Sequence, residues 1–319
     1  MRKVLPGTRE SAGVMLGVAA ILIWATSSAC VLGIGRQVGI WQYLAIGNFI
    51  GFLGQVVIYW RLGRRPRSLF LLPWRLWLLA VLGFVIYTAC YVTGLLTAAT
   101  NAQAVGVSLL NYLWPILTVI FSLFLVSGSR MTWRLGVAVG LSMIGLVIAN
   151  QQEIRQVGAS GSVLPYVLGG LAGICWGLYS ALIARWREWS QSYATAPVGF
   201  LLVSLVGITG CLLTGEWHAI DARTWLAFGY LGLLPNATGY LLWELALHRA
   251  SPMTLGLLGA ATPVLSTLCL LALFAVTGQS RTLPAHWPAL IFGALLVAAA
   301  VLLVSCKPSA TADSTAADG

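Results

Sequence analysis

Ten long stretches of this chain are apolar and almost free of charged side chains. They cover residues 11–35, 41–60, 76–97, 101–126, 135–149, 163–184, 193–213, 225–247, 251–276 and 287–306. A helix needs roughly 20 mostly apolar residues to cross a bilayer, whereas transmembrane barrels consist of short segments with alternating hydrophobicity. The sequence therefore predicts an all-α membrane protein with ten transmembrane helices.

The chain has too few charged residues to cover the surface of a soluble protein. Hydrophobic residues make up 59 % of its 319 residues and charged residues 8 %, against about 45–50 % and about 25 % in soluble domains. The six cysteines lie inside the apolar stretches, and no two have the spacing of a metal site. We therefore expect no soluble enzyme, no cofactor, no metal and no nucleic-acid partner.

Basic residues are distributed unevenly between the two sides of the predicted bundle. Four of the 18 Lys and Arg residues (Arg36, Arg155, Arg223 and Arg281) fall on one side, and the other 14 fall on the side of the N-terminus. Positive charges near membrane spans stay on the cytoplasmic side. We therefore expect both termini in the cytoplasm, with residues 1–10 as a cytoplasmic N-terminus and 307–319 as a disordered tail.

The two halves of the chain resemble each other. Three pairs of segments recur in the same order, at offsets of 148 to 152 residues: 17–24 with 169–176, 83–91 with 232–240, and 109–115 with 257–263. We therefore predict a first five-helix repeat over residues 11–150 and a second over 163–306. Because five is an odd number, the repeats have opposite orientations. Inverted repeats are typical of transporters that hold their substrate between the two halves.

Polar and aromatic side chains inside the apolar stretches indicate which faces line a central cavity, because such side chains tend to face the bundle interior. Residues three or four apart share a helical face in the first, third, sixth and eighth stretches. On this basis we expect cavity positions at Trp24, Ser28, Tyr87, Tyr91, Trp176, Tyr179, Asn236, Tyr240 and Trp243. Ordinary packing inside the bundle is the alternative for each.

Three prolines interrupt the predicted spans. Pro115, Pro235 and Pro263 each lack an N–H and free the carbonyl four residues earlier. Broken helices are tolerated in membranes where they line a cavity. A substrate ammonium group is one candidate partner for these carbonyls, and neighbouring helices or water are the others. Pro115 and Pro263 are also candidate hinges.

The fourth stretch contains further candidate residues just before Pro115. Asn111 and Trp114 lie three residues apart, on one helical face. Tyr112 lies roughly 200° round a regular helix from Trp114. A regular helix would therefore direct only one of the two rings into the cavity.

Glu244 is the only carboxylate inside a predicted span, about one turn from its cytoplasmic end. We expect it either to extend towards water or to pair with Arg249 or Arg185. A role in proton coupling is the functional alternative.

Glycines spaced four apart, such as Gly136 and Gly140, or Gly169, Gly173 and Gly177, permit close helix contact. We expect these contacts to lie within one chain rather than between two chains.

With ten spans, two repeats and a proline in the fourth and ninth spans, the chain resembles the drug/metabolite transporter superfamily (EamA-type). The segment Asn111-Tyr112-Leu113-Trp114-Pro115, together with Trp24 and the stretch from Trp176 to Tyr179, is similar to the aromatic amino acid exporter branch. The resemblance implies a cavity formed by spans 1, 3, 4, 6, 8 and 9. It also implies substrate contacts at Tyr87, Tyr112, Trp114 and Trp176.

The function expected from these features is export of aromatic and other neutral amino acids across a bacterial inner membrane by alternating access. Aromatic faces stack on aromatic substrates, and a zwitterion needs no buried countercharge. An exporter of other small metabolites or drugs, such as purines or threonine, is the alternative with the same fold. The expected partners are a small neutral substrate and the lipid bilayer, with a monomer as the expected state.

Overall fold

The computed structural model describes residues 6–99, 101–149, 151–156, 162–186, 194–266, 269 and 287–305. Within these ranges all regular structure is helical, with no strand, which confirms the all-α prediction. The predicted tail at 307–319 lies outside the described residues.

The described part of the first half contains eight α-helices, a short 3-10 helix η1 and a π-helical segment η2. Their bounds are α1 Pro6–Ala25, α2 Ser28–Arg61, η1 Pro66–Phe70, α3 Trp74–Ala80, η2 Val81–Ile86, α4 Tyr87–Leu96, α5 Asn101–Asn111, α6 Trp114–Leu125, α7 Trp133–Ala149 and α8 Gln151–Gln156. The helix α1 therefore begins inside the segment 1–10 that was expected to precede the first span.

The described part of the second half also consists of α-helices, and it contains a second π-helical segment, η3. Its elements are α9 Leu164–Arg185, α11 Thr195–Thr214, α12 Ala222–Leu231, η3 Gly232–Gly239, α13 Tyr240–Leu247, α14 Pro252–Gly259 and α16 Trp287–Ser305. By length and composition, four helical stretches of the described chain are suited to cross a membrane: Gln37–Arg61, Trp74–Leu96, Leu164–Arg185 and Thr195–Thr214.

The first predicted span is not continuous, contrary to expectation. The helix α1 ends at Ala25, and a turn at Thr26 and Ser27 separates it from α2. The hydroxyls of Thr26 and Ser27 donate to the carbonyls of Ile23 (2.6 Å) and Trp24 (2.7 Å). Such local bonds offer the backbone an alternative to the helix ladder. No proline signals this break in the sequence.

The fourth and ninth predicted spans are broken just before their prolines. Residues 112 and 113 form a turn between α5 and α6, and residues 260 and 261 form a turn after α14. The third and eighth spans stay helical but contain the π-helical segments η2 and η3, the second of them around Pro235. In each broken span, the proline lies in the first turn of the helix that follows the break, where its missing N–H costs no helix bond.

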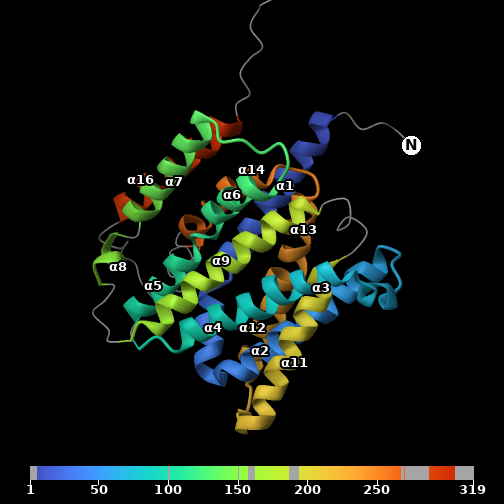
Figure 1. Ribbon diagram of the computed structural model, residues 1–319. Helices are drawn as coiled ribbons and strands as arrows, with labels where there is room; N and C mark the ends of the chain where they lie inside the picture. The colour runs from blue at the N-terminus through green and yellow to red at the C-terminus, as the bar shows by residue number, and fades with distance from the viewer. Residues whose placement is uncertain are drawn as a thin grey trace, which may run out of the picture.

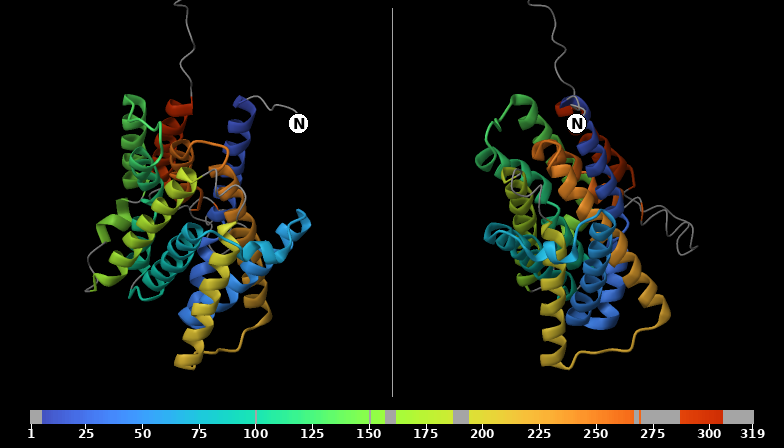
Figure 2. Two further views of the ribbon diagram at one scale, coloured as in Figure 1. Left: turned by 45° about the vertical axis from the view of Figure 1, so that its right-hand side comes forward. Right: turned by 90° about the vertical axis from the view of Figure 1, so that its right-hand side faces the viewer.

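Figures 1 and 2 show that α1 begins and α16 ends at the same end of the molecule. The helices α7 and α16 lie side by side at one edge of the bundle. On the other side α11 packs along α2, where the Ser204 hydroxyl donates to the carbonyl of Ala45 at 2.8 Å. Helices α4, α5 and α6 contact α9 and, with α1, α2 and α13, surround the interior described next.

Glycines let these helices approach closely. A Cβ at Gly169, Gly173 or Gly177 would lie within about 3 Å of backbone or side-chain atoms of α5 and α6, which confirms that this stripe serves packing within the chain. By contrast, a Cβ at Gly136 or Gly140 on α7 would meet no described atom within 4 Å.

Candidate functional site: an aromatic cavity between the two halves

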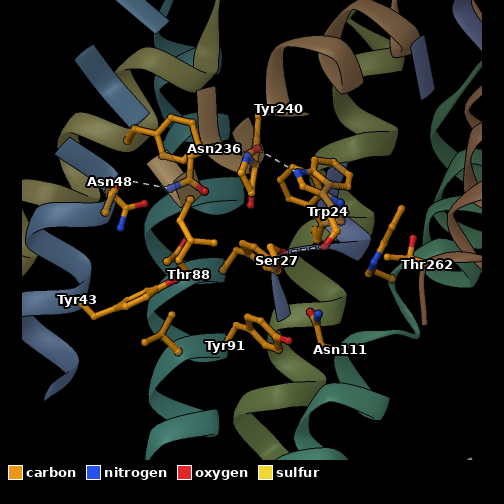
Figure 3. A pocket seen from close by; sticks show the side chains of 18 of the residues that line it. Trp24, Ser27, Tyr43, Asn48, Thr88, Tyr91, Asn111, Asn236, Tyr240 and Thr262 are labelled. Carbon is orange, nitrogen blue, oxygen red and sulfur yellow. Dashed lines mark hydrogen bonds between the residues drawn. The ribbon is translucent and has the colours of Figure 1, made fainter. Parts of the chain in front are cut away.

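A cavity of about 120 Å³ lies in the interior of the bundle. A cavity of ~150 Å³ holds a benzene molecule, so this space has the scale of a single aromatic ring. Its lining comes from the ends of α1, α5 and α12, the start of α6, the middle of α2, and α4, α9, α11, η3, α13 and the segment after α14 (Figure 3). The lining residues are Trp24, Ser27, Tyr43, Gly47, Asn48, Tyr87, Thr88, Tyr91, Val92, Asn111, Tyr112, Trp114, Trp176, Phe200, Leu231, Pro235, Asn236, Tyr240 and Thr262.

Trp176 and Trp24 are the centre of the aromatic wall. The Trp176 ring lies 5.2 Å from that of Tyr87, 5.0 Å from Tyr240 and 5.7 Å from Trp24, measured between centroids. Trp24 also lies 6.5 Å from Trp114, edge to face. Edge-to-face and offset contacts are the favoured geometries of aromatic pairs, at about 0.5–1.5 kcal/mol each beyond burial. The wall is therefore a connected set of rings from both halves of the chain.

Most polar groups of the cavity already have partners in the protein. The Trp24 indole N–H donates to the carbonyl of Pro235 at 3.2 Å, and the Asn236 amide donates to the carbonyl of Gly47 at 3.3 Å. The Thr262 hydroxyl donates to the carbonyl of Gly259 at 2.7 Å. That carbonyl is one of those freed by a proline, so here a neighbouring side chain replaces the missing N–H. The Oδ1 atom of Asn111, in contrast, is buried without a hydrogen-bond partner in the described part of the chain.

None of the residues that line the cavity is Lys, Arg, His, Asp or Glu. A guest with a net charge would lose its hydration there without meeting a counter-ion, which is costly. The lining therefore suits a ligand without net charge that presents an aromatic or apolar surface and a few hydrogen-bonding groups.

Nine of the residues predicted from the sequence line this cavity: Trp24, Tyr87, Tyr91, Asn111, Tyr112, Trp114, Trp176, Asn236 and Tyr240. The side chain of Ser28 lies outside the described residues, and the neighbouring Ser27 lines the cavity instead. Pro115 and Pro263 follow the two helix breaks.

Two further predicted residues, Tyr179 and Trp243, lie behind the lining rather than in it. Tyr179 is fully buried, and its ring stacks on Trp176 at 4.9 Å. Trp243 is also fully buried, 5.3 Å from Trp114, and donates to the Ser180 hydroxyl at 3.2 Å. Both therefore support the rings of the wall and do not face the cavity.

The break between α5 and α6 explains how the side chains of Tyr112 and Trp114 can both line the cavity. Both rings line the cavity, which a regular helix does not allow. Residues 112 and 113 form a turn, with the Leu113 N–H donating to the carbonyl of Leu110 at 3.2 Å. The turn changes the direction of the chain between the two residues. Both rings can therefore face the cavity, although a regular helix would direct only one of them there.

Sequence reasoning missed several lining residues on the second and seventh predicted spans. Tyr43, Gly47 and Asn48 come from α2 and Phe200 from α11, neither of which belongs to the six spans that the resemblance implied. Tyr43 and Asn48 are aromatic and polar residues inside an apolar stretch, so the rule applied to the first span would also have found them.

Glu244 does not extend towards water. Its side chain is 4 % exposed, and its Oε1 accepts hydrogen bonds from the hydroxyls of Tyr179 (2.6 Å) and Thr195. The expectation of an outward-reaching carboxylate is therefore wrong. The reason is that α13 is packed on α9 and α11 at this level, which supplies hydroxyl donors inside the bundle.

Comparisons with known proteins agree with this architecture. Residues 11–151 match the EamA-like transporter family. A protein of Ancylobacter novellus named aromatic amino acid exporter YddG is 29 % identical over 280 residues, which cover 82 % of this chain and 88 % of that protein. The proteins of the same name from Salmonella typhimurium and Escherichia coli are 24 % and 25 % identical, over 79 % and 74 % of this chain and 85 % and 67 % of their own lengths.

A solved crystal structure of a protein is 25 % identical to this chain and superposes with a TM-score of 0.76 over 93 % of this chain and 96 % of that one. The helical fold and the likeness to the exporters thus extend over most of the chain. The chain is therefore a multi-pass membrane protein whose residues 11–151 are similar to the EamA-like transporter family.

Proposed function

We propose that this protein exports aromatic and other neutral amino acids from the cytoplasm across a bacterial inner membrane. The observation that carries the proposal is the cavity, whose lining combines a wall of tryptophan and tyrosine rings with uncharged polar groups and contains no charged residue. An aromatic amino acid matches both features, since its ring stacks on such a wall and its charges cancel.

Alternating access between two inverted repeats, residues 11–150 and 163–306, supplies the transport mechanism. Irregular backbone at matching positions supports the repeat. The breaks at residues 112–113 and 260–261 differ by 148 positions, and the π-helical segments η2 and η3 fall in the corresponding third and eighth spans. Two halves of opposite orientation have two equivalent ways to pack, one open to each side of the membrane.

We infer the orientation of the protein in the membrane from the distribution of its basic residues. The N-terminus and C-terminus lie on the side that carries most of the basic residues, which stay in the cytoplasm. We expect a monomer to be the transporting unit, because residues from both halves of this chain line the cavity.

Purified protein in liposomes tests the function directly. We expect uptake of labelled phenylalanine that saturates with concentration and shows counterflow, which distinguishes a carrier from a channel. Transport equal to that of protein-free liposomes would contradict the proposal. Competition by unlabelled tyrosine, tryptophan, threonine and a purine then defines the range, and strong inhibition by the purine alone would favour the alternative of a general metabolite exporter.

A further inference from the structure

Asn111 is the one lining residue of the cavity with a buried side-chain oxygen that has no hydrogen-bond partner in the described part of the chain. The residue is 3 % exposed, and Figure 3 shows its amide group directed into the cavity. A buried polar atom without a partner costs about 1–3 kcal/mol. Such an atom at the wall of a binding cavity is a candidate ligand contact.

The chemistry of this position is that of a hydrogen-bond acceptor. The side chain of Asn111 interacts with that of Tyr87, but its Oδ1 has no hydrogen-bond partner among the described residues, so Oδ1 is the atom left for a ligand. Asn111 is also the last residue of α5. Carbonyl groups at a helix C-terminus carry partial negative charge, and Pro115 has no N–H for the carbonyl of Asn111. The unpaired Oδ1 and the C-terminal end of α5 thus favour a cation here.

The carboxylate of an amino acid has no partner in the cavity comparable to the unpaired oxygen of Asn111. No lining residue is cationic, and the indole N–H of Trp24 and the amide of Asn236 donate to backbone carbonyls. A carboxylate in this cavity therefore has no paired counter-ion and only neutral donors to meet.

We propose that Asn111 binds the ammonium group of the substrate through Oδ1, while the aromatic ring of the substrate packs against Trp176 and Tyr240, so that the amine rather than the carboxylate is recognised. This inference rests on the proposed function and narrows its substrate class to ring-bearing compounds with a free primary amine. Both an aromatic amine without a carboxylate and a deaminated aromatic acid carry a net charge in this uncharged cavity, but only the amine meets an unpaired acceptor, so it should bind more tightly than the acid.

Binding measurements on the intact protein in nanodiscs test this independently of transport. With isothermal titration calorimetry, we expect phenethylamine to bind wild-type protein at least about tenfold more tightly than 3-phenylpropionate, since a hydrogen bond to a charged group is worth about 1.5–3 kcal/mol. Asn111→Leu should weaken phenethylamine binding by at least that factor and leave 3-phenylpropionate unchanged. Asn111→Asp keeps the oxygen and should restore amine binding.

The matched control is Ser142→Ala, which removes another buried side-chain oxygen without a partner in the described part of the chain, on α7 and outside the cavity lining. We expect it to leave the ratio of amine to acid affinity unchanged. Tighter binding of 3-phenylpropionate than of phenethylamine to the wild type, or an unchanged ratio in Asn111→Leu, would overturn the inference. The wild-type comparison decides the matter even if the leucine variant fails to fold. Phenylalanine transport without this selectivity would refute only the inference, whereas selective amine binding without phenylalanine transport would refute only the proposed function.

Discussion

At the scale of single residues, Trp176 has the most contacts in the aromatic wall. Its ring contacts those of Trp24, Phe84, Tyr87, Trp114, Tyr179 and Tyr240. Each such pair contributes about 0.5–1.5 kcal/mol beyond burial. We expect Trp176→Ala to raise the apparent KM for phenylalanine at least about tenfold while the protein still inserts. Trp60→Ala, which changes a tryptophan that is 59 % exposed, is the matched control. Wild-type kinetics in Trp176→Ala would remove this ring from the site.

Glu244 supports a second residue-level prediction, on energy coupling. Its carboxylate meets the hydroxyls of Tyr179 from α9 and Thr195 from α11, and Tyr59 from α2 lies close enough to interact with it electrostatically. We expect a change in its protonation to alter this contact of α13 with α9, α11 and α2. In Glu244→Gln, the response of phenylalanine flux to an imposed pH gradient should be flat. Glu10→Gln, at an exposed position on α1, should behave like the wild type. An unchanged pH response in Glu244→Gln would exclude Glu244 from coupling.

Residues that line the cavity were predictable where a polar or aromatic side chain interrupted an apolar stretch. Nine of the nineteen lining residues, among them Trp24 and Tyr240, were predicted from the sequence. The positions of Tyr179 and Trp243 were not predictable, because a helical face says which side points inward but not how many layers of side chains lie between the helix and the cavity. The partners of Glu244 come from α9 and α11, so they follow only from the packing.

At the scale of elements, the chain at the break between α5 and α6 packs closely against a glycine of α9. A Cβ at Gly173 would lie 2.9 Å from the carbonyl oxygen of Leu110 and 3.1 Å from that of Asn111. Alanine is a better helix former than glycine by about 1 kcal/mol, but overpacking costs about 1–3 kcal/mol. We therefore expect Gly173→Ala to lower the melting temperature in detergent and to reduce transport. Gly170, on the same helix, has open space around its Cβ position, and Gly170→Ala should be neutral or stabilising. Equal effects of the two substitutions would contradict this role of the glycine.

The elements themselves were largely predictable, because apolar stretches between charged loops fix where membrane helices lie. Prolines at 115 and 263 marked the breaks after α5 and α14. The break after α1 and the π-helical segment η2 had no such signal. Lipid-facing and core-facing residues are both apolar in a membrane, so hydrophobic periodicity does not reveal that α2 and α11 also face the cavity.

At the scale of the whole molecule, the contact between α1 and α13 (Figure 1) joins the two proposed repeats between the cavity, which Trp24 and Tyr240 line, and the end of the bundle at which α1 begins. Alternating access requires this contact to open during each transport cycle. The Cβ position of Gly17 on α1 lies 3.7 Å from the Cβ of Ala246 on α13, close to the mean of about 3.8 Å found across disulfide bonds. The double variant Gly17→Cys/Ala246→Cys, in a background with the six native cysteines replaced, can therefore be cross-linked.

We expect the oxidised double variant to lose phenylalanine transport to the level of protein-free liposomes and to regain it on reduction, because the disulfide holds the end of the bundle at which α1 begins closed. The single variant Gly17→Cys, treated with the same oxidant, controls for the side chain introduced next to Leu255. Binding of phenylalanine from the opposite side should survive oxidation, since the cross-link does not touch the lining. Full transport by a quantitatively cross-linked protein would mean that the halves need not separate here, and a carrier built from two rocking repeats would be excluded.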